Sequence, residues 1–230
     1  MLRLNLRKGD STWRFGPIQW GEVDGDDLAP TQAAARLAGR KVCVFGHGYN
    51  VSEPDDAYAR LAMHLDGVYD EFIGLKWPGS KWTAAFWLAQ LRAMLADALS
   101  GLDCAALDIE AHSLGCRVAC EALLNGLRCR NVILAGAAID NESLALDSRF
   151  GWATANAHRI LVAHSAHDEV LGRAGRVGLF DTPLGLYGLE PGRRYLPHVM
   201  ALDCSESVHQ HSAYKGDTRV FLPAWQQLAR

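Results

Sequence analysis

The sequence predicts a three-layer α/β fold, with a mostly parallel central sheet covered by helices on both faces. Segments with the period of a strand alternate with segments with the period of a helix, as in chains of right-handed βαβ crossover units. The central strand-like segments are continuously apolar, as in "KVCVFG" from Lys41, which is typical of strands buried on both faces. A third observation, a turn-like tripeptide between two short strand-like runs near the start, adds an antiparallel edge.

That edge is expected within residues 1–22. The runs "LRLNL" and "STWRFGPIQWGEV" flank the turn Lys8-Gly9-Asp10 and predict an N-terminal hairpin. Residues 23–39 read as a linker with one short helix.

The remaining elements follow in alternation. We expect strands in "KVCVFG" from Lys41, "FIGLKWP" from Phe72, "AALDIEA" from Ala105, "NVILAGAA" from Asn131, "RILVAHS" from Arg159 and "VMALDC" from Val199. We expect helices over 55–65, 83–99 and 114–127, and a closing helix from Pro223.

Two segments bear on access to a site. About twenty residues separate the strands at Asn131 and Arg159, so no large lid is expected there. Residues 172–197 are rich in glycine, arginine and proline without a clear period, and predict a long irregular loop. Trp77 and Trp82 either line an acyl pocket or pack in the core, and Arg193 and Arg194 either meet an anionic substrate or form a solvated pair.

Composition limits the function classes. The 230 residues predict one domain, and 23 basic against 26 acidic residues give a net charge of -3, which favours neither nucleic acid nor an anionic membrane as a partner. The N-terminus has no continuous apolar stretch and no segment is long enough to span a bilayer, so a cytoplasmic protein is expected. The six cysteines are expected as buried free thiols, with no metal site.

The octapeptide "IEAHSLGC" points to chemistry at Ser113. Small residues two positions before and after it, Ala111 and Gly115, allow a strand to reverse sharply into a helix and thrust the serine outward, a relaxed form of G-x-S-x-G. The alternative is that Ser113 merely caps the helix from Leu114. A reacting serine needs a base, a group that orients the base, and donors for an oxyanion.

The oxyanion donors are expected at two loops. In "FGHGYN" the glycines Gly46 and Gly48 let the backbone approach a ligand, so the amide of Tyr49 can face a substrate oxygen, and the amide of Leu114 is the second donor. His47 either contacts substrate or fills space under the loop.

Four motifs together resemble the α/β-hydrolase superfamily: HGYN after the first parallel strand, AHSLG, HDEV and HSAY, in that order between Lys41 and Tyr214. They are similar in particular to short bacterial α/β hydrolases with HGYN and a terminal His-Ser-aromatic motif. The resemblance implies the α/β-hydrolase fold, the chain order nucleophile, acid, histidine, and hydrolysis of an ester or related acyl bond. No cofactor is expected.

The acid and the base each have alternatives. Asp168, just beyond the strand from Arg159, is the first candidate for the acid, with Glu169 and Asp140 as the others. His211 of HSAY is the favoured base, and His209 is the alternative. His112 is expected to point away from the reacting groups or to contact substrate.

These residues predict a serine hydrolase of the esterase or lipase type that acts on a small-molecule acyl substrate through Ser113, Asp168 and His211. Two other functions stay open, acyl transfer or thioester hydrolysis by the same triad, and a hydrolase-like fold used only for binding.

Overall fold

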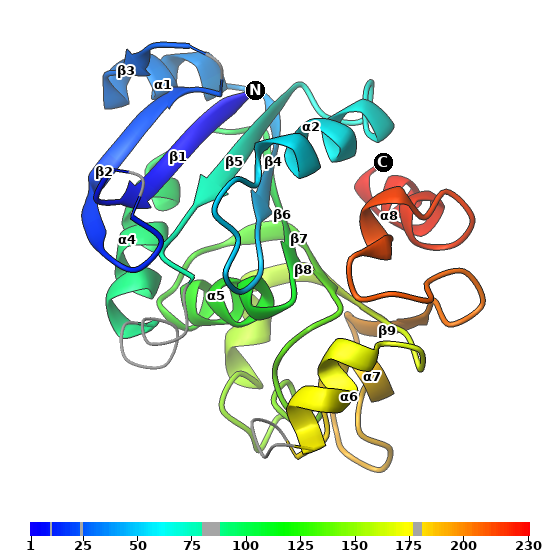
Figure 1. Ribbon diagram of the computed structural model, residues 1–230. Coiled ribbons are helices and arrows are strands. Elements are labelled where there is room, and N and C mark those ends of the chain that lie inside the picture. Colours follow the sequence, from blue (N-terminus) through cyan, green and yellow to red (C-terminus); the bar gives the residue numbers. More distant parts are fainter. Residues whose placement is uncertain (10, 24, 80–87, 177–180) are drawn as a thin grey trace.

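A single twisted sheet runs through the computed structural model, which describes residues 1–9, 11–23, 25–79, 88–176 and 181–230 (Figure 1). Within these residues the sheet has nine strands in the order β3-β2-β1-β5-β4-β6-β7-β8-β9. From β1 to β9 every neighbouring pair is parallel. The predicted fold class, with a mostly parallel sheet and helices on both faces, is confirmed. The strands are β1 Leu2–Arg7, β2 Phe15–Glu22, β3 Asp27–Leu28, β4 Lys41–Gly46, β5 Glu71–Lys76, β6 Ala106–His112, β7 Cys129–Ala135, β8 Ala157–His164 and β9 Val199–Asp203.

The predicted N-terminal hairpin is present as β1 and β2, which pair antiparallel from Leu2 with Glu22 to Arg7 with Phe15. Its first strand is an inner strand, however, because β1 also pairs in parallel with β5. The two-residue β3, which the sequence left within a linker, pairs with β2 at the edge of the sheet. A register shift between Asn5 and Arg7 interrupts the hairpin, and this irregularity turns Arg7 into the protein.

Alternating side chains of the central strands divide the core between the two faces. In β4, Val42 and Val44 join one apolar cluster, while Cys43 and Phe45 join the other. The first face is covered by α1 Pro30–Leu37, α4 Leu88–Ser100, α5 Leu114–Leu124 and the 3-10 helix η1 Trp152–Asn156. The second is covered by α2 Asp55–His64, the 3-10 helix η2 Ala213–Gly216 and α8 Phe221–Ala229 (Figure 1).

Two helices lie in the segment that was expected to be an irregular loop. They are α6 Glu169–Arg176 and α7 Leu184–Tyr187, and both follow β8. Their side chains Leu171 and Leu186 pack with Ala138 in a small apolar cluster of their own. The segment lacks a helical period because these helices are short and glycine interrupts both.

The connection from β7 to β8, residues 136–156, contains the short helix η1 and no large lid. The expected helix over 83–99 is described from Leu88, as α4, and its first part lies outside the described residues. All six cysteines are free thiols, and every one except Cys104 is buried. In the described ranges, no helix is both long enough and apolar enough to cross a membrane.

Candidate active site

Ser113 stands at the turn from β6 into α5 with a strained backbone. Its φ of 56° and ψ of -123° lie in a region that residues other than glycine rarely adopt, which costs about 1–3 kcal/mol. Backbone hydrogen bonds hold this geometry: the Ser113 amide donates to Ala135 O at 3.0 Å, and Ser113 O accepts from Ala138 N at 3.1 Å. No side-chain cap hydrogen bond links Ser113 to α5. This geometry is typical of a side chain that projects outward from a sharp turn, and not of a residue whose side chain caps a helix.

The sharp turn depends on two close approaches. A β-carbon on Gly115 would stand 2.5 Å from the carbonyl oxygen of His47, so α5 passes β4 at a distance that only glycine permits. A β-carbon on Gly48 would stand 2.8 Å from Ser113 Cβ and 3.3 Å from Ser113 Oγ. The HGYN loop therefore lies directly against the serine.

The expected oxyanion donors are the amide of Tyr49, in this loop, and that of Leu114, the first residue of α5. Among the described residues, neither Tyr49 N nor Leu114 N donates to a backbone carbonyl outside regular helix and strand bonding. Asn50 has a φ of 52° and donates its amide to Gly79 O at 2.9 Å, which fixes the far side of the loop. The Tyr49 side chain is exposed.

Arg7 supports the segment that follows the HGYN motif, a role that no pattern in the sequence indicated. Its guanidinium donates to three carbonyl oxygens, those of Val51 and Ser52 at 2.6 Å each and that of Trp77 at 3.1 Å. Only 2% of its surface is exposed. In the sequence Arg7 continues a strand of alternating leucine and polar residues, and the irregularity that turns it inward has no residue signature.

His47 and Trp77 lie inside this support. The His47 ring stacks on Trp77 with centroids 5.2 Å apart, its Nδ1–H donates to Gly48 O, and its Nε2 accepts from Trp77 N. Both side chains are buried, and burial lowers the pKa of His47 to about 3. His47 and Trp77, the two residues considered as substrate contacts, are thus packed inside the protein rather than exposed at the surface of the loop. Trp82 lies outside the described residues.

The acid and base candidates come together from two other loops. His211 Nδ1–H donates to Asp168 Oδ2 at 2.7 Å, and Asp168 is buried. Asp168 Oδ1 accepts from Leu171 N, so both oxygens of the carboxylate are held. Gly136 lies next to both groups with a φ of 54°, and a β-carbon there would be in ordinary contact with Asp168 Oδ2 at 3.4 Å and with His211 Nδ1 at 3.5 Å.

The other candidates for the acid and the base lie outside this hydrogen-bonded pair. Glu169 is exposed and forms an ion pair with Arg173, and Asp140 accepts from the amide of Asp181. The ring of His209 lies 5.0 Å from that of His167, beside a cavity of about 370 Å³ next to Asp168. Of the candidate carboxylates and histidines, Asp168 and His211 are the pair that form a hydrogen bond.

His112 does not point away from these groups, and that expectation is wrong. Its Nε2–H donates to the carbonyl oxygen of His211 at 2.7 Å, and the two rings lie 4.6 Å apart. Because successive side chains of β6 alternate between faces, His112 is on the face that η2 covers, beside the segment that carries His211. Burial, together with the charge of His211, lowers the pKa of His112 to about 3.

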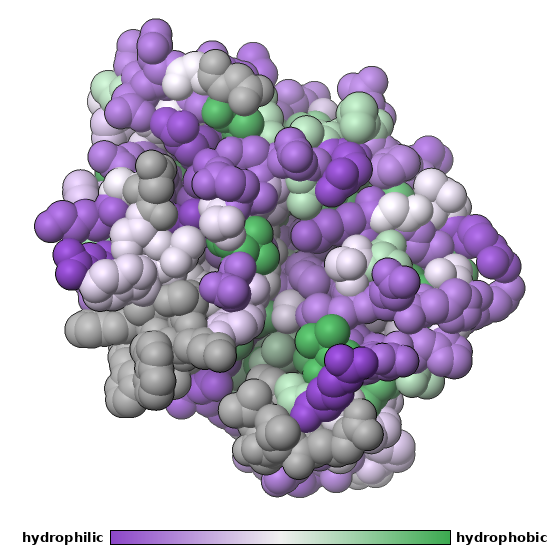
Figure 2. Space-filling view, viewed as in Figure 1, coloured by the Kyte–Doolittle hydropathy of each residue, from purple (hydrophilic) through white to green (hydrophobic). Residues whose placement is uncertain are grey.

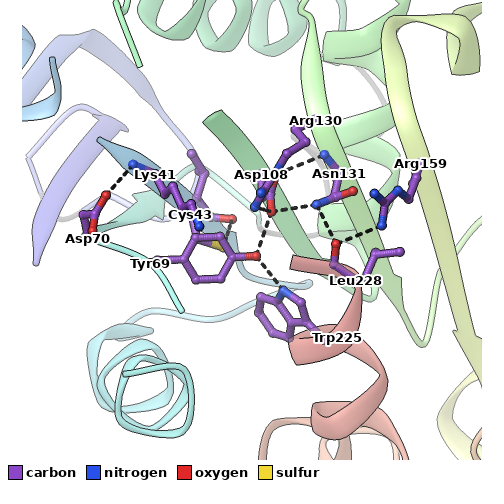
Figure 3. Close-up of polar contacts among 11 residues, drawn as sticks. Lys41, Cys43, Tyr69, Asp70, Asp108, Arg130, Asn131, Arg159, Trp225 and Leu228 are labelled. Carbon is purple, nitrogen blue, oxygen red and sulfur yellow. Dashed lines mark hydrogen bonds and ion pairs between the residues drawn. The ribbon is translucent and has the colours of Figure 1, made fainter. Parts of the chain in front are cut away.

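Asp108 and Glu110 lie on the same face of β6 as His112, and both are buried. Asp108 accepts from Tyr69, Arg130 and Asn131 (Figure 3). Glu110 differs, because among the described residues its Oε1 is buried without a hydrogen-bond partner. Burial raises the pKa of Glu110 to about 7, and the charge of Lys215 opposes that shift.

The surroundings of the serine combine apolar and polar surface. Leu114 packs against the cluster of Ala138, Leu171 and Leu186, so an apolar wall begins next to the serine. The face viewed in Figure 2 is hydrophilic over most of its described surface, with small separate apolar areas.

A cavity of about 560 Å³ lies at the amino-terminal ends of β6 and β7, at the opposite ends of the strands from Ser113, and none of the candidate residues lines it. Among the described residues, no group of three or more His, Cys, Asp or Glu is arranged to hold a metal ion.

Comparison with known proteins gives only remote similarity. No protein-family model and no curated protein matches the chain. Solved structures that it resembles include TT1662 from Thermus thermophilus, with 15% identity over 84% of this chain and 90% of that chain and a TM-score of 0.48. Est1E from Butyrivibrio proteoclasticus with ferulic acid bound has 12% identity, over 83% and 87%, and a TM-score of 0.45. The esterase domain of a Rhodothermus marinus protein has 14% identity, over 82% and 85%, and a TM-score of 0.44. These values carry no argument about activity, which has to come from the site itself.

Proposed function

We propose that the protein is a serine hydrolase that cleaves an ester or related acyl bond. One observation supports this most strongly: the 2.7 Å hydrogen bond between His211 and a buried carboxylate joins segments that follow β9 and β8, at the carboxyl ends of the parallel strands, where Ser113 follows β6 with a φ of 56°. A carboxylate bonded to Nδ1–H fixes the tautomer whose Nε2 is free to accept a proton. Strained backbone of this kind is concentrated at functional sites.

In the proposed reaction Ser113 Oγ attacks the acyl carbon while His211 Nε2 takes the hydroxyl proton. Negative charge develops on the carbonyl oxygen and is stabilised by the amides of Tyr49 and Leu114. When the tetrahedral intermediate collapses, the leaving alcohol receives the proton from His211 and an acyl-serine remains. Water then attacks this ester, gives its proton to His211, and releases the acid with Ser113 restored.

Ser113 Oγ makes no hydrogen bond to His211 within the described part of the chain. In enzymes without substrate this contact is often long and tightens only when substrate binds. The proposal therefore requires that Ser113 Oγ and His211 Nε2 come within hydrogen-bond reach of each other when substrate is bound.

The test is hydrolysis of p-nitrophenyl acetate and butyrate by the intact protein and by Ser113→Ala, with acid release measured in water and in the presence of an added alcohol or amine. The proposal expects turnover to free acid and a loss of about 10⁴-fold or more in the variant. Predominant transfer to the added acceptor would replace hydrolysis by acyl transfer. Equal turnover by both proteins would exclude Ser113 as the nucleophile.

A further inference from the structure

His112 has a position that substrate binding does not explain. It directly precedes Ser113, yet only 6% of the residue is exposed, and its side chain contacts the segment that carries His211. The contact is specific, because Nε2–H donates to the His211 carbonyl at 2.7 Å and the ring packs 4.6 Å from the His211 ring at 50°.

His211 needs such a contact because it lies on irregular backbone. The chain from Cys204 to Ser212 forms turns between β9 and η2, not a helix or a strand. The hydrogen bond to Asp168 fixes the imidazole at one atom, Nδ1, and leaves the ring able to swing about that point. A hydrogen bond to the carbonyl of the same residue holds the backbone from which the ring extends, and catalytic groups lose activity when they are displaced by about 1 Å.

The same imidazole also touches the other side of the site. A β-carbon on Gly48 would stand 3.4 Å from His112 Nδ1, so His112 lies between the HGYN loop and the His211 segment. His112 is the last residue of β6, and Ser113 follows it directly at the start of α5.

His112 is neutral, and a neutral ring is favourable next to His211. Proton transfer from Ser113 makes His211 positive, and a second positive ring 4.6 Å away would oppose that step. Burial disfavours protonation of His112, and so do the charges of His211 and of Lys215 on η2, the element packed over it. Other groups that face this region are His47 in the HGYN loop, which is itself buried and neutral, and Glu110 on the same strand.

We infer that His112 is a positioning residue for the proposed reaction: as a neutral donor to the His211 carbonyl, it holds the general base in register with Ser113. The inference rests on the proposed function, and it assigns to His112 a role in geometry rather than contact with substrate. His112 is not a catalytic residue in this account, because it touches no reacting atom.

The experiment compares three variants of the full chain. His112→Gln retains an amide N–H at a reach close to that of Nε2, and His112→Leu keeps similar volume without a donor. His198→Leu is the matched control, because His198 Nε2 also donates to a backbone carbonyl, that of Thr154 at 3.0 Å, before the first residue of β9 and away from the site. Hydrolysis of p-nitrophenyl butyrate gives kcat and KM, and NMR follows the imidazole proton of His211 that is shared with Asp168.

We expect His112→Leu to lower kcat by about 10- to 100-fold with KM within about twofold, and to weaken or broaden the His211 imidazole signal. His112→Gln restores most of both, and His198→Leu changes neither. A His112→Leu variant with normal kcat and an unchanged His211 signal overturns the inference. So does a His112→Leu defect that His112→Gln does not relieve, because volume or folding would then be the cause.

The NMR measurement separates this inference from the proposed function. One outcome is that the intact protein hydrolyses no ester while the His211 signal is lost in His112→Leu and kept in His112→Gln. That result supports the positioning role of His112 and contradicts the proposed hydrolase function. If Ser113-dependent hydrolysis is present and all three variants match the intact protein in kcat and in the His211 signal, the function stands and positioning fails.

Discussion

Gly48 and Ser113 are packed so closely that the loop has no space for a side chain at Gly48. A β-carbon there would stand 2.8 Å from Ser113 Cβ, closer than real β-carbons approach one another, and both atoms are fixed to backbone. The geometry of the proposed nucleophile and that of the HGYN loop therefore depend on each other.

Gly48→Ala is expected to displace either Ser113 or the Tyr49 amide, and to lower kcat/KM by about 10²-fold or more, the effect of losing one oxyanion donor. Gly101→Ala is the control, because a β-carbon on Gly101 meets nothing within 4 Å. Steady-state hydrolysis of p-nitrophenyl butyrate measures both. Equal rates for the two variants would show that the Gly48 contact has no part in catalysis.

Arg7→Met tests the support of the HGYN loop. It leaves the carbonyls of Val51, Ser52 and Trp77 without their charged donor, and we expect the free energy of unfolding to fall by about 2–4 kcal/mol together with a loss of kcat. Arg3→Met, on the same strand, removes an ion pair with the exposed Asp27 and should cost under about 1 kcal/mol. Urea unfolding and initial rates give the comparison, and similar costs for the two variants would contradict this account of Arg7.

Acid should destabilise the protein through two buried histidines. The pKa values of His47 and His112 are lowered from 6.5 to about 3, so the unfolded chain binds protons that the folded protein refuses. Stability is full above pH 6.5 and is lost as the pH falls toward 3, at about 2 kcal/mol per histidine between pH 7 and pH 5. In urea unfolding at these two pH values, His112→Gln should lose about 2 kcal/mol less than the intact protein. An identical loss would mean that His112 is not held neutral.

Glu110 should make the folded protein less stable as the pH rises, which is opposite to the effect of the two histidines. Its pKa is raised from 4.5 to about 7, so the folded protein keeps a proton that the unfolded chain releases. Stability from this group is complete below pH 4.5 and falls as the pH rises to 7, by about 3 kcal/mol. Glu110→Gln is therefore expected to gain on the intact protein in urea unfolding as the pH is raised from 5 to 8. A constant difference across that range would remove Glu110 as the titrating group.

The layers of the fold could be predicted from the sequence, but the contacts of Arg7 and His112 that surround the candidate site could not. Continuous apolar strands and amphipathic helices specify which faces are buried, so a mostly parallel sheet and the alternation of strands and helices along the chain were predictable. The motif residues Ser113, Asp168 and His211 were named from local patterns, and the structure brings Asp168 and His211 into contact. Arg7 and the orientation of His112 were missed because each depends on a contact between segments 40 or more residues apart, and one follows a strand irregularity without a sequence signature.

The most direct test of the central claim is covalent labelling by a fluorophosphonate, followed by mass spectrometry of the modified peptide. Such a probe reacts with a serine that a neighbouring base activates, and it requires no knowledge of the substrate. The account predicts one adduct at Ser113 in the intact protein and none in Ser113→Ala. An adduct that persists at the same rate in Ser113→Ala, or no adduct in the folded intact protein, would contradict it.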